Sequence, residues 1–199
     1  MHFKNNWQAL LLMACITPAL SGCAGRGDTK PDAARQFLTA LTAHCGKAYA
    51  GRIVANEPAN ADDPFANKPL IMHVRDCGDD EMRVPFHVGD DHSRTWVLTR
   101  STARLRLKHD HRHQDGSPDV LTWYGGTSAT PGSAQRQEFP ADQESRELFV
   151  REKIPVSVDN VWAMEITART FTYELARPNR LFRVEFDLSR PVALPPPTW

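Results

Sequence analysis

Histidines alternate with charged residues in the middle of the chain, where residues 103–119 have the sequence ARLRLKHDHRHQDGSPD. In an extended strand, successive side chains point to opposite faces. One face then carries Leu105, Leu107, His109, His111 and His113, and Asp115 continues it at the following turn. The leucines mark this face as the interior of the protein. The opposite face is charged and carries Arg104, Arg106, Lys108, Asp110 and Arg112.

Two histidines at positions i and i+2 of a strand can bind one metal ion through their neutral imidazoles. His109 and His113 lie about 13 Å apart along a strand, so all three histidines cannot easily bind the same ion. A third ligand would come from Asp115 or from one of the further histidines, His73, His87 and His92. One interpretation is therefore a Zn²⁺ site on His109, His111, His113 and Asp115.

Two other interpretations of these histidines stay open. The first is that one of the three histidines holds a haem group in an aromatic pocket. The simplest interpretation is a hydrated, hydrogen-bonded rim at the mouth of a β-barrel, where ligands usually bind. Trp123 and Tyr124 follow the histidines and are candidate ligand-binding residues, although aromatic residues on strands also fill cores. The sequence has no Gly-x-Ser-x-Gly elbow, phosphate-binding loop or dinucleotide fingerprint, so it indicates no catalytic residue.

Alternation of apolar and polar residues predicts the strands that must position these side chains. It covers the segments 70–75, 82–88, 104–113, 162–167, 171–175 and 182–188, and the β-rich runs 94–99 and 120–124 add two further strands. Gly, Asp, Asn and Pro between the segments indicate turns, for example at Gly125-Gly126. Short connections favour an antiparallel meander, and closing a long meander protects its edges. We therefore predict an all-β fold, with a meander closed into a β-barrel of about eight to ten strands.

Two segments depart from this alternation. Residues 31–46 carry apolar side chains at helical spacing, between a Pro-Asp start and a glycine stop, and predict an N-terminal helix with Cys45 on its apolar face. Residues 141–153 are charged and predict a short helix or a long loop across one barrel end. Pro85 interrupts a strand pattern and indicates a bulge or an edge. The C-terminal PVALPPPTW predicts extended polyproline.

The first 23 residues, MHFKNNWQALLLMACITPALSGC, have the anatomy of a secretory signal. Lys4 precedes an apolar run that is too short to span a bilayer as a helix. The last four residues, Leu20-Ser21-Gly22-Cys23, resemble the lipobox of bacterial lipoproteins. This resemblance implies that Cys23 is diacylated and becomes the mature N-terminus, with the lipid membrane as its partner. It also implies sorting to the outer membrane, facing the periplasm, because Ala24 rather than Asp follows.

The chain is therefore expected to have three parts: a signal peptide over residues 1–22, a tether over 23–30 and a single domain over 31–199. Cys15 would leave with the signal and Cys23 would carry lipid, so Cys45 and Cys77 remain. Their compartment permits disulfides, and two cysteines this far apart match no zinc-binding spacing. We predict a Cys45–Cys77 disulfide that closes a loop of about 33 residues.

Composition narrows the class of protein. The chain has 199 residues, 24 Lys and Arg against 24 Asp and Glu, and 41% hydrophobic residues. These values fit one globular domain and exclude a collagen or a multi-span membrane protein. A net charge of zero argues against a dedicated nucleic-acid binder, so no nucleic-acid partner is predicted.

Residues 50–190 resemble a calycin-type or lipocalin-like β-barrel in their strand rhythm, although the lipocalin Gly-x-Trp motif is not found near the first strand. The stretches FHVGDDHSRTWVLTR (86–100) and LRLKHDHRHQDGSPDVLTWYGG (105–126) resemble a group of uncharacterised secreted bacterial proteins. These resemblances favour a membrane-anchored periplasmic lipoprotein whose barrel binds a small molecule, a lipid or an ion. Two alternatives stay open. One is a metal-dependent enzyme, such as a hydrolase, that uses His109, His111 and His113. The other is a structural envelope protein with a filled barrel.

Overall fold

The computed structural model describes residues 1–2, 32–59, 63–102 and 104–199. The chain divides into two units, Met1–Lys30 and Pro31–Trp199, and all the helices and strands below belong to the second. Apart from Met1 and His2, the predicted signal peptide and the tether, with Cys23, lie outside the described residues. In the described ranges, no helix has the length and apolar character that crossing a membrane requires.

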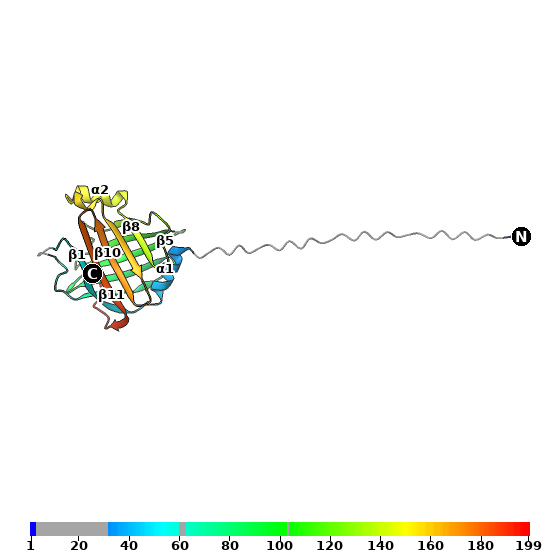
Figure 1. The fold of residues 1–199 in the computed structure, drawn as a ribbon, viewed down its shortest axis with the longest axis horizontal. Helices are drawn as coiled ribbons and strands as arrows, with labels where there is room; N and C mark the ends of the chain where they lie inside the picture. Colours follow the sequence, from blue (N-terminus) through cyan, green and yellow to red (C-terminus); the bar gives the residue numbers. More distant parts are fainter. Residues whose placement is uncertain (3–31, 60–62, 103) are drawn as a thin grey trace. The chain divides into compact units, whose positions relative to one another are not determined.

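One antiparallel sheet forms most of the Pro31–Trp199 unit, and it curls into a nearly closed barrel (Figure 1). Its 11 described strands are β1 (Ala48–Glu57), β2 (Leu70–His73), β3 (Asp76–Cys77), β4 (Glu81–Val88), β5 (Asp91–Ser101), β6 (Arg104–His111), β7 (Tyr124–Thr127), β8 (Arg136–Pro140), β9 (Val161–Ile166), β10 (Thr170–Arg177) and β11 (Arg180–Val192). They follow the order β7-β6-β5-β4-β2-β1-β11-β10-β9-β8, with β3 beside β4. This arrangement confirms the predicted all-β meander.

The barrel closes in two different ways. The first and last strands, β1 and β11, pair along most of their length, from Ala48 opposite Val192 to Glu57 opposite Leu181. The remaining gap therefore falls in the middle of the chain, between β7 and β8. There the backbone N–H of Asp142 donates to the carbonyl of Gly125 at 2.9 Å. The Ser145 hydroxyl also bonds to the N–H and the carbonyl of Gly125, at 2.7 and 3.0 Å.

Gly125 and Gly126 lie inside β7, so the prediction of a turn at these residues is wrong, and the predicted strand over 120–124 begins only at its last residue. The physical reason is the close approach of neighbouring backbones. A Cβ on Gly125 would lie 2.0 Å from the Leu107 carbonyl oxygen, and one on Gly126 would lie 1.8 Å from that of Pro140. Only glycine fits at this seam, where β7 is held between β6 and β8.

Two short helices cover opposite ends of the barrel (Figure 1). α1 (Ala33–Thr42) is capped by the Asp32 carboxylate and buries Ala34, Phe37, Leu38 and Leu41 in the core. α2 (Gln143–Arg151) is capped by Asp142 and buries Leu148 and Phe149. It is followed by the single-turn helix η1 (Pro155–Ser157). The helix predicted over part of 141–153 is therefore confirmed.

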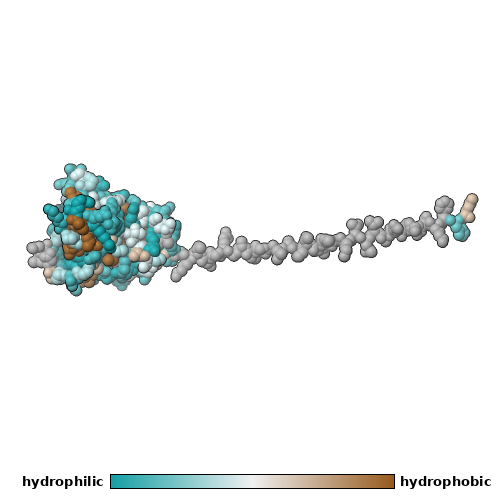
Figure 2. All heavy atoms as spheres, turned by 90° about the horizontal axis from the view of Figure 1, so that it is seen from above, coloured by the Kyte–Doolittle hydropathy of each residue, from teal (hydrophilic) through white to brown (hydrophobic). Residues whose placement is uncertain are grey.

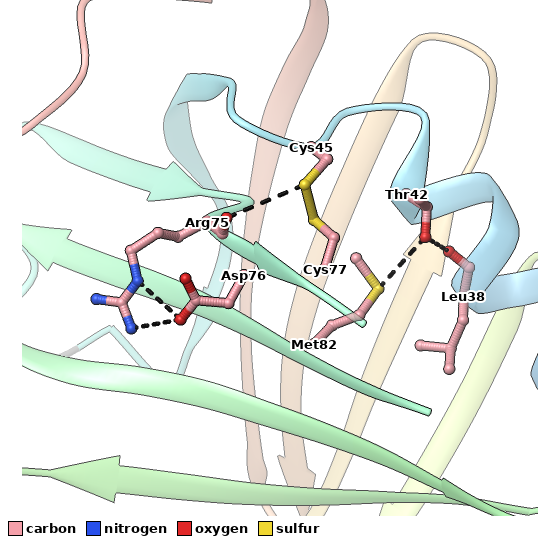
Figure 3. The surroundings of a disulfide bond; sticks show 7 residues. All are labelled: Leu38, Thr42, Cys45, Arg75, Asp76, Cys77 and Met82. Atoms are coloured by element: carbon pink, nitrogen blue, oxygen red, sulfur yellow. Dashed lines mark hydrogen bonds and ion pairs between the residues drawn. A yellow bond between two sulfur atoms is a disulfide. The ribbon is translucent and has the colours of Figure 1, made fainter. Parts of the chain in front are cut away.

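The disulfide between Cys45 and Cys77 is present, as predicted (Figure 3). α1 ends at Thr42, earlier than predicted, so Cys45 lies in the turn after the helix and not on its apolar face. Cys77 belongs to β3, which pairs with β4. The bond thus fixes the end of α1 against the sheet, where the Thr42 hydroxyl also contacts the Met82 sulfur at 3.9 Å.

Three strands, β1, β3 and β8, lie outside the predicted segments, and β3 has only two residues. In β1, alanine and glycine occupy much of the strand, and register shifts at Tyr49/Gly51 and Ile53/Ala55 interrupt the period of two. β8 has only five residues. Pro85 lies between the residues of β4 that pair with β3 (Met82 and Arg83) and those that pair with β2 (Phe86 to Val88). This break in the pairing agrees with the edge predicted at Pro85. The C-terminal segment differs slightly from its prediction, because β11 continues through Pro191 and Val192 before the polyproline residues.

Aromatic side chains from several strands fill the middle of the barrel. The Trp96 ring stacks between Phe86 and Tyr173, with centroid distances of 4.8 and 4.5 Å. Phe171 and Phe186 pack beside it, and both are fully buried. The packing is different at the end that α2 covers.

Candidate functional site

A cavity of about 350 Å³ lies at the α2 end of the barrel. Its wall combines α2, η1 and the segment before β7 with the ends of β9, β10 and β11. Aromatic and aliphatic side chains form most of this wall, among them Phe65, Leu121, Tyr124, Phe149, Trp162 and Leu175. Figure 2 views the molecule from the α2 side and shows hydrophobic atoms gathered on this face.

Tyr124, one of the two predicted ligand-binding residues, contributes its ring to the cavity wall. The ring stacks on His109 with a centroid distance of 4.6 Å and lies 5.6 Å from Trp162. Burial raises the pKa of Tyr124 to about 12, so the hydroxyl stays protonated and can donate a hydrogen bond. Trp123 differs: it is 37% exposed, has a positive φ of 60° and does not line the cavity.

His109 lies behind the cavity wall and is only 3% exposed. Its Nδ1 donates to the Tyr124 carbonyl at 3.1 Å, because a carbonyl can only accept. Its Nε2 therefore accepts the Tyr173 hydroxyl at 2.9 Å. Burial is the main cause that lowers the pKa of His109 to about 3, and the nearby His111 adds to it. His109 is thus a neutral imidazole with both nitrogens occupied, which fixes the tyrosines that shape the cavity.

His111 lines the cavity itself. Its Nε2 forms a hydrogen bond of 3.2 Å with the Tyr124 hydroxyl, and its backbone N–H donates to the Thr122 hydroxyl. Burial, followed by the positive charge of Arg94, lowers the pKa of His111 to about 4. At neutral pH the cavity therefore presents an uncharged imidazole at this position.

The other two predicted metal ligands lie outside the barrel. β6 ends at His111, so the predicted strand does not extend to His113. The His113 backbone bonds to Ser117 in a turn, and the Asp115 carboxylate accepts from the Ser117 N–H and hydroxyl. Within the part of the chain that the structure describes, no group of three or more His, Cys, Asp or Glu side chains could hold a metal ion. The set of His109, His111, His113 and Asp115 is therefore not assembled there.

Two of the further histidines considered as third ligands, His87 and His92, contact each other. The Nδ1 atoms of His87 and His92 lie 2.7 Å apart, and His87 is 2% exposed. Burial lowers the pKa of His87 to about 4, and the neighbouring His92 and His73 contribute. The C-terminal Trp199 lies near this pair, with its ring 6.2 Å from that of His92.

The charged face of β6 is less exposed than its sequence indicates. Lys108 is 2% exposed, and its ammonium lies 2.9 Å from Asp142 and 2.8 Å from Glu144. Asp110 is 7% exposed and pairs with Arg112 at 3.2 Å. The face is charged, as predicted, but Lys108 is buried because the start of α2 covers it and provides its counter-charges.

The polar residues of the cavity wall are the main feature that the sequence analysis missed. They are Asp119, Ser157, Asn160, Arg177 and Arg180, in addition to His111. A signal for the two arginines exists: Arg177 continues the alternation of Phe171, Tyr173 and Leu175, and Arg180 continues that of Phe182 and Val184. Extending the interior faces of β10 and β11 to their ends would have placed both arginines inside the barrel.

Comparison of the chain with protein-family models, with curated proteins and with solved structures finds no match.

Proposed function

We propose that this protein binds a small, largely apolar molecule in the cavity at the α2 end of its barrel. The observation that carries the proposal is the contrast between the two halves of the interior. Aromatic side chains fill the barrel around Trp96, whereas about 350 Å³ remains open between Trp162 and α2. A concave, mostly aromatic wall with a few polar groups is the usual form of a small-molecule site.

The wall is held in place by contacts that do not depend on a ligand. The hydrogen bonds of His109 fix Tyr124 and Tyr173 from behind, and Tyr124 also bonds to His111. Phe149 of α2 packs 5.5 Å from the Tyr124 ring. A preformed wall lowers the entropy that a ligand loses on binding. These contacts support binding in preference to a purely structural role.

Binding can be measured with N-phenyl-1-naphthylamine, a neutral apolar probe whose fluorescence rises in apolar surroundings. The variant Leu175→Trp fills the cavity, and we expect it to weaken binding about tenfold or more, which corresponds to about 1.4 kcal/mol. Leu121→Trp fills the cavity from another segment and gives an independent test. The matched control is Leu194→Trp, because Leu194 is exposed and does not line the cavity.

Two results would contradict the binding function. The wild-type protein would fail to bind the probe, or the variants Leu175→Trp and Leu121→Trp would bind it as tightly as Leu194→Trp does. Circular dichroism and thermal unfolding of each variant show whether the barrel is intact. A folded protein that does not bind would favour the structural alternative.

We also propose that the barrel is anchored to the outer membrane through lipid on Cys23 and faces the periplasm. The support is the sequence Leu20-Ser21-Gly22-Cys23 after an apolar signal, together with the disulfide, which suits an oxidising compartment. Cys23→Ser should release the protein from the membrane fraction. Retention of this variant in membranes to the wild-type extent would show that Cys23 is not the anchor.

A further inference from the structure

Two arginines face each other at the mouth of the cavity. Arg177 ends β10 and Arg180 begins β11, and the two residues are direct cross-strand partners. Both line the cavity, on the faces that point into the barrel. Like charges directly opposite each other on one face of a sheet destabilise it. This pair therefore lowers the stability of the sheet, and the fold alone does not explain why two arginines lie there.

Among the described residues, the hydrogen bonds of the two arginines are with uncharged groups. Arg177 donates to the Asn160 side-chain oxygen at 3.1 Å. Arg180 donates to the Asn56 side-chain oxygen at 2.6 Å, and its guanidinium lies 5.6 Å from the centre of the Phe182 ring. Burial, and then the charge of Arg180, lower the pKa of Arg177. Across the described ranges, neither arginine has a carboxylate within ion-pair distance.

Several other arginines of the sheet are paired with carboxylates, whereas Arg104 and Arg106 of β6 form no ion pair with the described residues. Arg94, whose guanidinium lies over the Phe65 ring, bonds to Asp91 at 2.6 Å. Arg136 and Arg183 both bond to Glu174, at 2.9 and 3.0 Å. Arg177 and Arg180 thus differ from Arg94, Arg136 and Arg183, each of which has a carboxylate beside it.

Asp119 is the one carboxylate among the described residues that line the cavity. Its Oδ1 accepts from the Leu121 N–H at 2.8 Å, and its Oδ2 lies 4.0 Å from His113 Nδ1. These contacts hold the Asp119 carboxylate in its own loop. The cavity therefore combines a mostly apolar wall with two arginine charges and one carboxylate, and the carboxylate already accepts a hydrogen bond within its own loop.

We infer that the ligand of this cavity is an amphipathic anion, whose charged group is bound by Arg177 and Arg180 while its apolar body contacts Trp162, Tyr124 and Leu175. The inference rests on the proposed binding function and specifies its ligand class. Carboxylate, sulfonate and phosphate groups share the required chemistry, because a guanidinium donates two parallel hydrogen bonds to any of them. Binding such a group would also relieve the repulsion between the two arginines.

Two fluorescent probes with the same ring system separate the contributions of charge and apolar area. 8-Anilino-1-naphthalenesulfonate carries a sulfonate, and N-phenyl-1-naphthylamine lacks it. We expect the wild-type protein to bind the sulfonate about tenfold more tightly, the order of one hydrogen bond to a charged group. Increasing the salt concentration should weaken binding of the sulfonate and leave binding of the neutral probe unchanged.

The main variant is Arg177→Gln, because Arg177 makes fewer contacts with the fold than Arg180 does. It should lower affinity for the sulfonate about tenfold and change affinity for the neutral probe by less than about twofold. Arg177→Lys keeps the charge but lacks the planar guanidinium. Its affinity for the sulfonate should lie between those of Arg177→Gln and the wild type. The matched control is Arg190→Gln, which should bind both probes like the wild type, because the Arg190 side chain is 86% exposed at the other end of β11. Leu175→Trp should weaken binding of both probes.

Equal affinity of the wild-type protein for the two probes, without an effect of salt, would overturn the inference and leave the binding function standing. An Arg177→Gln variant that loses both probes equally while folded would also overturn it. If the wild-type protein binds neither probe, the proposed function fails and the ligand class fails with it. If the Arg177 variants do not fold, the effect of salt on binding of the sulfonate by the wild-type protein still tests whether the cavity prefers an anion.

Discussion

The pH dependence of stability should show whether His109 is buried as a neutral imidazole. Its pKa is about 3 in the folded protein, against 6.5 for an unperturbed histidine. Between these values the unfolded state binds a proton that the folded state does not. The free energy of unfolding must therefore fall as the pH drops below 6.5. The stability that comes from burying His109 as a neutral imidazole is fully present only above that pH.

The size of this effect follows from the two pKa values. Between pH 7.5 and pH 5.0, protonation of His109 in the unfolded state lowers the free energy of unfolding by about 2 kcal/mol. His87 and His111, each with a pKa of about 4, change the free energy in the same direction. Carboxylates whose pKa is lowered, such as Asp91 and Asp142, lose their contribution only at lower pH. The interval above pH 5 thus isolates the histidines.

The assay is urea denaturation followed by circular dichroism at pH 7.5 and pH 5.0. In His109→Gln, the side-chain amide can still donate and accept hydrogen bonds but does not titrate. We expect the loss of stability between the two pH values to be about 2 kcal/mol smaller in this variant than in the wild type. The control is His113→Gln, since the His113 side chain is 56% exposed and lies outside the barrel. A loss in His109→Gln equal to that of the wild type would refute the reasoning.

Three further predictions concern the closure of the barrel, the disulfide and the buried lysine. Gly126→Ala should lower the free energy of unfolding by at least about 2 kcal/mol, because its Cβ would meet the Pro140 carbonyl; urea denaturation near the wild-type midpoint would contradict this. The double variant Cys45→Ser/Cys77→Ser should lose about 3–4 kcal/mol, and thiol labelling of the denatured, unreduced wild type should detect neither cysteine. Lys108→Met should cost about 1–3 kcal/mol in thermal or urea unfolding, because it leaves Asp142 and Glu144 without their ammonium. Lys47→Met, at an exposed position, is the matched control and should unfold like the wild type.

Elements whose signal is local could be predicted from the sequence. A period of two in residues 82–88 or 182–188 depends only on which side chains face a core, and it predicted β4 and the central part of β11. The N-terminal helix and its Asp32 start were predicted for the same reason. The Cys45–Cys77 disulfide also followed from the sequence, because few cysteines were left to pair. The interior position of His109 and His111 followed from the leucines before them.

Features that depend on contacts between distant segments could not be predicted from the sequence. Gly125 and Gly126 have the composition of a turn, and their place inside β7 follows from how closely the Leu107 and Pro140 backbones approach them. Lys108 is buried because α2, more than 30 residues later in the chain, supplies its two carboxylates.

The histidines do not form a common site, because the strand ends at His111 and Tyr173 occupies the Nε2 of His109. The cavity is likewise a tertiary feature: β10 and β11 bring Arg177 and Arg180 to a mouth whose wall comes from α2 and the segment before β7. The residues of such a site share no local pattern, since their proximity is created by the closure of the barrel.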